Sequence, residues 1–156
     1  LPGTYSLSPQ SLDERISRDV LLNHLPEVPP PDLVVVVVDA SNLERNLYYA
    51  TQVIELGYPT LIALNMMDVA EQNGHHIDVK RLAEWLGVPV LPIVASVGRG
   101  LPELKREILD GKNQNPVNSS ARGTTVFCDF PAVITGELQK LAGLLRLSGK
   151  PRVVAV

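Results

Sequence analysis

Cysteine is nearly absent from this sequence, since Cys128 is the only one among 156 residues. A single cysteine excludes an internal disulfide framework and is typical of a chain that folds in a reducing compartment. Aromatic residues are also scarce, at 4% of the chain. The hydrophobic core must therefore be built from aliphatic side chains.

A long hydrophobic run is missing as well. The longest aliphatic run extends from Leu33 to Val38, between two aspartates. It is too short to cross a bilayer, because a spanning helix needs about 20 apolar residues. No charged segment followed by an apolar one opens the chain, so no signal peptide is predicted.

Neither sign of charge is in large excess. The net charge is −3, with 45% hydrophobic and 20% charged residues. This composition is that of an ordinary globular protein, which argues against wholesale disorder. It gives no electrostatic reason to expect nucleic acid as a partner. The length suits a single domain with a sizeable core.

Short β-branched runs alternate with segments of helical periodicity. The runs predict strands that are buried on both faces, at residues 33–38, 60–64 and 88–94. The periodic segments predict helices at residues 11–22, 43–56, 79–86 and 101–109. Asp78 is the expected N-cap of the helix over 79–86, and Gly87 is its expected end. This alternation predicts an α/β fold with a mainly parallel sheet flanked by helices.

Ligands of open parallel sheets bind at the carboxyl ends of the strands. Asn65 and Asp68 follow the second predicted strand. A carboxylate in that position can accept hydrogen bonds from N1–H and the 2-amino group of guanine. Adenine has neither group, so it would leave the carboxylate unpaired, which discriminates strongly. The alternative interpretation of Asn65 and Asp68 is a turn followed by a helix cap.

Two further segments could contribute to the same nucleotide site as Asn65 and Asp68. The backbone of Val94, Ala95 and Ser96 follows the next predicted strand and could donate an N–H group to guanine O6. The N-terminal segment Leu1-Pro2-Gly3 could bring a glycine N–H group to a terminal phosphate. Taken alone, the first segment is equally an ordinary turn from strand to helix, and the second an ordinary Pro-Gly turn.

Several stretches together resemble one family closely. They are LPGTYSLSP and SLDER near the N-terminus, VVDASNLERNLY over 37–48, and LNMMD over 64–68. The family is that of ferrous iron transport protein B, a bacterial membrane protein with an N-terminal GTPase domain. The resemblance covers about residues 1–110 in order, and residues 111–156 are similar to the start of the family's helical domain.

The resemblance implies a P-loop-NTPase-like G domain that binds GTP or GDP. Leu1, Pro2 and Gly3 match the end of the family's D-x-P-G motif, which places switch II immediately after them. Asn65, Met66, Met67 and Asp68 match the base-recognition motif, and Val94, Ala95 and Ser96 match the loop at guanine O6. These residues form the expected nucleotide-binding set, and no residue is assigned as catalytic or as a metal ligand.

The resemblance also implies that the intact protein is a GTPase that uses Mg²⁺ and couples GTP hydrolysis to Fe(II) uptake. Its partner would be the membrane permease region of the same polypeptide, and the domain would lie on the cytoplasmic side of the bacterial inner membrane.

The chain departs from the family pattern in several places. The aspartate expected before Leu1 is absent, and no G-x-x-x-x-G-K-[ST] loop occurs in the 156 residues. The switch I threonine would lie upstream. Met66 stands where the wider GTPase motif has lysine, and Val94 stands where serine is frequent. We therefore expect this chain alone to recognise guanine but to bind triphosphate weakly and hydrolyse little.

The expected organisation is a partial G domain over residues 1–111, lacking its N-terminal part, then a linker over 112–123 and an incomplete helical segment over 124–156. The missing strands would expose a sheet edge, so we expect self-association. Two other functions remain open: a non-catalytic protein-interaction module, and a different small GTPase. Metal binding by the adjacent His75 and His76 is not expected, because neighbouring side chains diverge on an extended chain.

Overall fold

The computed structural model of the chain describes Leu7, residues 12–113 and Phe127. The chain divides into two compact units, Leu1–Thr125 and Val126–Val156. All the elements described below belong to the first unit. The expected contacts of Leu1, Pro2 and Gly3 fall outside the described residues. So do the predicted helical segment over 124–156, apart from Phe127, and almost all of the predicted linker.

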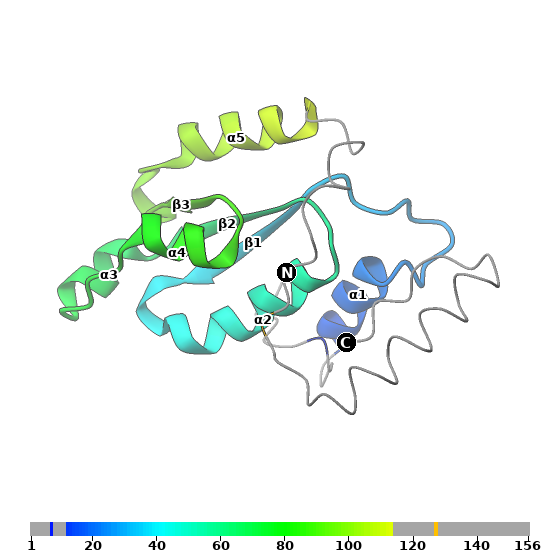
Figure 1. Cartoon of the computed structure of the whole chain (residues 1–156), viewed down its shortest axis with the longest axis horizontal. Coiled ribbons are helices and arrows are strands. Elements are labelled where there is room, and N and C mark those ends of the chain that lie inside the picture. The colour runs from blue at the N-terminus through cyan, green and yellow to red at the C-terminus, as the bar shows by residue number, and fades with distance from the viewer. Residues whose placement is uncertain (1–6, 8–11, 114–126, 128–156) are drawn as a thin grey trace. The chain divides into compact units, whose positions relative to one another are not determined.

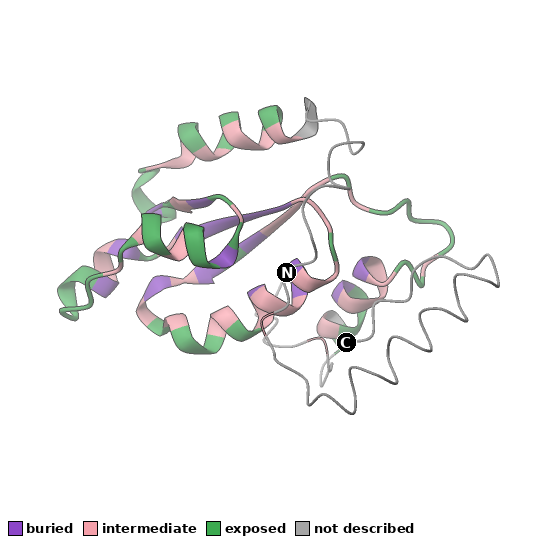
Figure 2. Cartoon of the chain, viewed as in Figure 1, coloured by how far each residue is buried: buried purple, intermediate pink, exposed green. Residues whose placement is uncertain are grey.

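A parallel three-stranded sheet forms the centre of the described region (Figure 1). Its strands are β1 (Val34–Asp39), β2 (Thr60–Asn65) and β3 (Val90–Pro92), in the spatial order β1-β2-β3. The central strand β2 is buried on both faces, as its continuous apolar sequence predicts. Ile62, Ala63 and Leu64 are each 0% exposed. The core of the domain is therefore aliphatic and centred on β2 (Figure 2).

Within the described residues, five α-helices and two short 3₁₀ turns accompany the sheet. The helices are α1 (Leu12–Leu21), α2 (Leu43–Glu55), α3 (Met67–Gln72), α4 (Val79–Leu86) and α5 (Leu101–Asn113), and the turns are η1 (Ala40–Asn42) and η2 (Ala95–Val97). Helix α2 packs on β1 and β2, and α4 packs on β3. Figure 1 shows α5 along the other side of the sheet from α2. Strands and helices thus alternate as the sequence predicts.

The ends of α4 form as predicted. The Asp78 side chain accepts a hydrogen bond from Arg81 N at 3.0 Å, which satisfies one of the free N–H groups of the first turn. Gly87 follows the helix with φ 69°, a conformation that glycine adopts without a steric penalty. Its N–H donates to the Ala83 carbonyl at 2.9 Å. Local sequence alone therefore sets the length of α4.

Three elements differ from the sequence predictions. Strand β3 spans 90–92 rather than 88–94, because Pro89 has no N–H group for the ladder and the Val94 N–H donates to Arg99 instead of to β2. Helix α3 was not predicted, since its six residues are too few to display a period. Helix α5 extends to Asn113 rather than ending at 109, so it includes Lys112, the first residue of the predicted linker.

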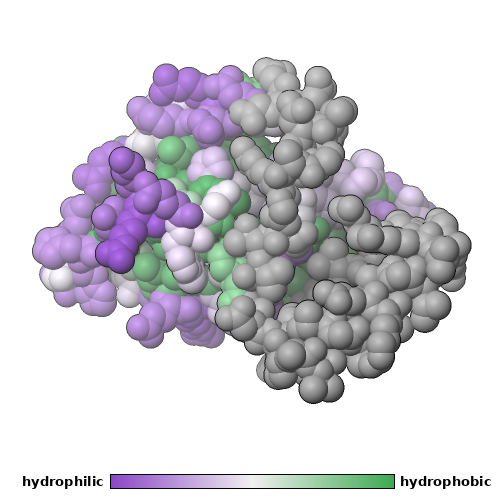
Figure 3. Space-filling model, viewed as in Figure 1, coloured by the Kyte–Doolittle hydropathy of each residue, from purple (hydrophilic) through white to green (hydrophobic). Residues whose placement is uncertain are grey.

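The edge strand β1 carries an unusual exposed side chain. Val37 is 63% exposed, whereas its neighbours Val36 and Val38 are buried. Among the residues that the structure describes, no strand pairs with the outer edge of β1. Figure 3 shows hydrophobic surface between the hydrophilic outer faces of the helices. No helix in the described part of the chain is long and apolar enough to cross a membrane.

Candidate functional site

The carboxyl ends of the three strands form the candidate site, which we call the rim. Asp39 and Asn65 end β1 and β2 and are register partners. Strand β3 ends at Pro92, next to Leu64 of β2 in the register. The turn η1 after β1 contacts α3, the helix that follows β2. The parallel register therefore brings three polar loop segments to one edge of the sheet, where ligands of such sheets bind.

One hydrogen bond joins two of these segments across thirty residues of sequence. The N–H of Ala95 donates to Asn65 Oδ1 at 3.0 Å. The prediction that the loops after β2 and β3 lie together is thereby confirmed. The bond also gives Asn65 a role within the protein, since its side chain holds the loop that carries Ala95. One of the N–H groups that the sequence analysis directed at guanine O6 is engaged by Asn65 in this structure.

Met66 has a left-handed backbone at the start of α3. Its φ and ψ are 61° and 34°, and its side chain is exposed. This conformation costs a non-glycine residue roughly 1–2 kcal/mol, and such strain is retained chiefly where the surroundings impose it. It places Met66 outward while Met67, the next residue, is buried. Of these two predicted site residues, only the side chain of Met66 is accessible at the rim.

Asp68 lies in the first turn of α3 and is partly exposed. Asp39 and Asp78 use their carboxylates to cap their own turns, since each accepts a backbone N–H group. Within the described part of the chain, the Asp68 carboxylate accepts no backbone N–H group. The N-cap residue of α3 is Met66, whose side chain makes no capping hydrogen bond. Asp68 therefore does not act as a helix cap, and its carboxylate oxygens are available to accept hydrogen bonds from a ligand.

The loop from Val94 to Gly100 is closed on itself, a feature that the sequence analysis missed. The N–H of Val94 donates to the Arg99 carbonyl at 2.9 Å, and the two residues form an isolated antiparallel bridge. Val94 is buried, whereas Ala95 and Ser96 are exposed. Gly98 and Gly100 both have positive φ, of 76° and 79°. The pattern G-x-G after a strand was the available signal for this tight turn.

Metal-binding clusters are not found in the described residues, where no three His, Cys, Asp or Glu side chains come together. His75 and His76 are both exposed and follow the end of α3. Nothing in the rim therefore assigns a described side chain to a resident metal ion.

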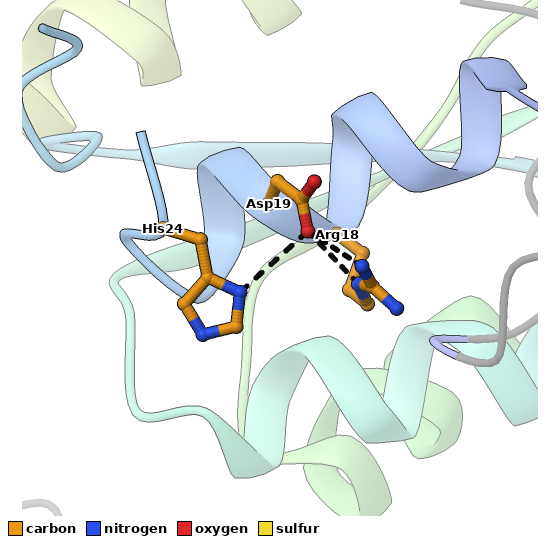
Figure 4. Close-up of polar contacts among 3 residues, drawn as sticks. All are labelled: Arg18, Asp19 and His24. Carbon is orange, nitrogen blue, oxygen red and sulfur yellow. Dashed lines mark hydrogen bonds and ion pairs between the residues drawn. The ribbon is translucent and has the colours of Figure 1, made fainter. Parts of the chain in front are cut away.

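A charged cluster lies at the end of α1, outside the rim (Figure 4). Asp19 Oδ1 accepts hydrogen bonds from Arg18 Nε at 3.0 Å and from Nη2 at 2.8 Å. His24 Nδ1 lies 3.6 Å from the same oxygen. Tyr58 Oη donates to the Leu21 carbonyl at 2.8 Å and ties this end of α1 to the segment before β2. The hydrogen bonds from Arg18 are the main reason that the pKa of Asp19 lies below 3.8, with His24 acting in the same direction and partial burial opposing it.

This cluster predicts a specific pH dependence. A lowered carboxyl pKa stabilises the folded state above the pKa of the unfolded chain, about 4, and the contribution is lost as pH falls through the folded pKa. We expect the Asp19 carboxyl carbon to titrate below its ordinary range in an NMR experiment. Arg18→Gln should move the midpoint upward more than His24→Gln does. A larger shift from His24→Gln would contradict the assignment of Arg18 as the main cause.

Several known proteins are similar to this chain over most of its length. The family model described as ferrous iron transport protein B matches residues 1–108. The Fe(2+) transporter FeoB of Salmonella typhimurium is 50% identical over 119 residues, which are 74% of this chain and 15% of that protein. FeoB of Escherichia coli K12 is 48% identical over 112 residues, 69% of this chain and 14% of that protein. The chain therefore spans about one seventh of the length of these relatives.

Solved structures of FeoB domains are also similar to this chain. The FeoB G-domain from Methanococcus jannaschii is 46% identical, with a TM-score of 0.66 over 73% of this chain and 70% of that one. The cytosolic domain of T. maritima FeoB in its GMPPNP form is 33% identical, with a TM-score of 0.80 over 99% of this chain and 56% of that one. The predicted fold class, a P-loop-NTPase-like G domain with a parallel sheet flanked by helices, is confirmed.

Proposed function

The chain belongs to the family of ferrous iron transport protein B, and from that premise we propose that its rim binds the base of a guanine nucleotide. Similar FeoB domains have been solved with GMPPNP and with GDP. The observation that carries the proposal is the bond from Ala95 N to Asn65 Oδ1. It joins the two loops that must act on one base, beside a carboxylate that accepts no hydrogen bond in the described region.

Each rim residue has a distinct role in this proposal. Asp68 accepts hydrogen bonds from guanine N1–H and the 2-amino group, since its carboxylate is partly exposed at the start of α3. The exposed Met66 thioether covers one face of the base, an apolar contact that a polarizable sulfur makes well. Asn65 holds the loop after β3 through the Ala95 N–H, which leaves the backbone N–H of the exposed Ser96 as the donor to guanine O6. Met67 and Val94 are buried and support this arrangement through packing.

For the whole transporter, the proposal is that GTP hydrolysis in this domain is coupled to Fe(II) uptake by a permease region of the same polypeptide. The domain then works on the cytoplasmic side of the bacterial inner membrane. Leu1, Pro2 and Gly3 belong to the part that senses the terminal phosphate. Phosphoryl transfer depends on positioning and on neutralising the phosphate charges, a task for a phosphate-binding loop and Mg²⁺. No residue of the rim described above is given either role.

Nucleotide preference tests the proposal directly. In the full-length transporter, a fluorescent GDP analogue should bind at least about 100-fold more tightly than the matching ADP analogue, because adenine leaves the Asp68 carboxylate unpaired. The 156-residue chain alone, which has no G-x-x-x-x-G-K-[ST] loop, should bind GTP weakly and without turnover.

The control is a guanosine competitor without phosphates, which isolates recognition of the base. Guanosine should displace the fluorescent analogue and adenosine should not. Equal binding of the two nucleotides would contradict the proposed base recognition. Micromolar, Mg²⁺-dependent GTP binding with turnover by the 156-residue chain would contradict the assignment of phosphate binding to other parts of the protein.

A further inference from the structure

We propose that Gly100 is the positioning residue of the base-recognition loop, because only a glycine there lets the chain fold back over β3 and present Ala95 to Asn65. The inference rests on the proposed function, which it deepens by naming a residue that controls the affinity for guanine. Gly100 lies beyond the matched base-recognition motif and is not one of the residues proposed to contact the base. Its effect on the base must therefore be transmitted through the loop from Val94 to Gly100, called the latch loop below.

The latch loop turns out of the sheet at a defined point. The N–H of Ile93 still donates to the Leu64 carbonyl of β2 at 2.8 Å, as a strand residue does. The N–H of the next residue, Val94, donates to Arg99 instead, at 2.9 Å. The chain has therefore reversed direction within the six residues from Val94 to Arg99, and the reversal brings Gly100 back over Pro92 and Ile93.

Gly100 sits where a side chain does not fit. A Cβ atom at this position would lie 2.5 Å from the Pro92 carbonyl oxygen and 2.9 Å from Ile93 Cγ2. A backbone oxygen on a strand cannot move aside as a flexible side chain would. The φ of Gly100 is 79°, which by itself strains any residue that carries a Cβ. A side chain at Gly100 must push the latch loop away from β3.

Ala95 follows Val94, whose N–H donates to the Arg99 carbonyl next to Gly100, so a displacement of the loop reaches Ala95 at the rim. The bond from Ala95 N to Asn65 Oδ1 is 3.0 Å long, and a shift of about 1 Å would break it. The loop backbone at Ala95 and Ser96 would then lose the position from which it addresses the base. The predicted result is weaker guanine binding together with faster amide exchange in the loop.

Gly98 supplies a matched control within the same loop. Its φ of 76° is nearly that of Gly100, but a Cβ there would meet no atom within 4 Å. Gly98→Ala therefore introduces the same backbone strain without the clash. In the full-length transporter, Gly100→Ala should weaken fluorescent GDP binding by about tenfold or more, since misplacement by about 1 Å is costly at a preorganised site. Gly98→Ala should change it by less than about threefold.

Hydrogen–deuterium exchange in the same protein reports on the loop independently of the nucleotide. Peptides covering residues 93–98 should exchange at least about tenfold faster in Gly100→Ala than in the wild type, because Ala95 loses its acceptor. Asn65→Ala should produce the same increase. In the Asn65→Ala background, Gly100→Ala should then weaken GDP binding much less, because the two changes act on one contact.

Three results would overturn the inference. The first is a loss of GDP affinity in Gly100→Ala no larger than in Gly98→Ala. The second is a loss of affinity with unchanged exchange over residues 93–98. The third is full additivity of Asn65→Ala and Gly100→Ala. If the wild type does not prefer guanine, the proposed base recognition fails, and the exchange comparison alone decides whether Gly100 holds the loop.

A second variant covers the case in which Gly100→Ala does not fold. Inserting one glycine between Gly98 and Arg99 lengthens the latch loop without adding a Cβ. It should also weaken GDP binding and accelerate exchange over residues 93–98. Unchanged affinity and exchange in a folded insertion variant would show that tight closure of the loop is not needed, and would overturn the inference.

Discussion

Asp68→Asn in the full-length transporter should weaken GDP binding about 100-fold, because a hydrogen bond to a charged acceptor contributes about 1.5–3 kcal/mol and the substitution removes the one from the guanine 2-amino group. Asparagine still offers an oxygen to guanine N1–H. Its amide N–H₂ then faces the 2-amino group, so that two donors meet. The same amide matches xanthine, which has a carbonyl oxygen in place of the 2-amino group. Affinity for xanthosine diphosphate should therefore rise relative to GDP, so that the preference falls or reverses.

The measurement is competition of both nucleotides against a fluorescent GDP analogue. Asp78→Asn is the control, since it makes the same chemical change at the N-cap of α4, where asparagine caps as well as aspartate does. It should leave both affinities unchanged. An equal loss for guanine and xanthine in Asp68→Asn would refute the assignment of Asp68 to the base, and would point to local unfolding of α3.

Leu64→Ala should destabilise the domain by about 2–5 kcal/mol, the range for truncating a fully buried leucine. Leu64 is 0% exposed in the central strand and immediately precedes Asn65. Its backbone carbonyl still accepts the Ile93 N–H in the variant, so the sheet ladder is kept and the loss reflects packing. The measurement is a urea titration of the 156-residue chain, with the free energy of unfolding compared at equal slope.

Leu109→Ala provides the control for that experiment. Leu109 lies on α5 and is 64% exposed, so the same truncation removes little buried area. Its effect should stay within about 0.5 kcal/mol. Similar losses from both substitutions would show that β2 is not the centre of the core. A large loss from Leu109→Ala alone would indicate that α5 buries this face against part of the protein outside the described residues.

The exposed edge of β1 gives the expectation of self-association a physical basis. Val37 is exposed on a strand whose outer edge is unpaired among the described residues. Such an edge is a template for further pairing. Self-association stays a prediction. The same edge is where additional strands would pair if the domain continues, and the two cases differ in the oligomeric state of the full-length transporter.

The sequence determined the element types wherever the pattern was long or locally specified. The valine run of β1 and the aliphatic run of β2 both form strands, and their predicted boundaries were accurate to within one residue. Burial on both faces was right for β2 and wrong for β1, where Val37 is exposed. Asp78 and Gly87 fixed both ends of α4 through contacts within a few residues. These features need only neighbours along the chain, so a single sequence contains them.

The rim was predicted in outline because a general rule places ligands at the carboxyl ends of parallel strands. That rule, together with the family resemblance, singled out Asn65, Asp68 and Ala95. The rule could not identify which N–H group at the rim donates to which acceptor. The pattern predicted only that an N–H group of Val94, Ala95 or Ser96 lies at guanine O6, and in the structure the Ala95 N–H donates to Asn65. Nor did the pattern predict the left-handed backbone of Met66 or the contact of α3 with η1, a segment distant in sequence.

What the sequence by itself determined was the aliphatic core, the alternation of strands and helices, and the family. Periodicity, turn residues and a matched motif are local properties, and they survive in a linear string. Only the tertiary structure decided that Gly100 has no room for a side chain, that the loop after β3 closes on Arg99, and that Asn65 bridges to Ala95. The bridge from Asn65 to Ala95 forms only when β2 and β3 pair in register, because distances across a sheet are not encoded in any short stretch of residues. The contacts of Gly100 and Arg99 span fewer than ten residues, but they depend on the path of the turn, which residue types alone do not specify.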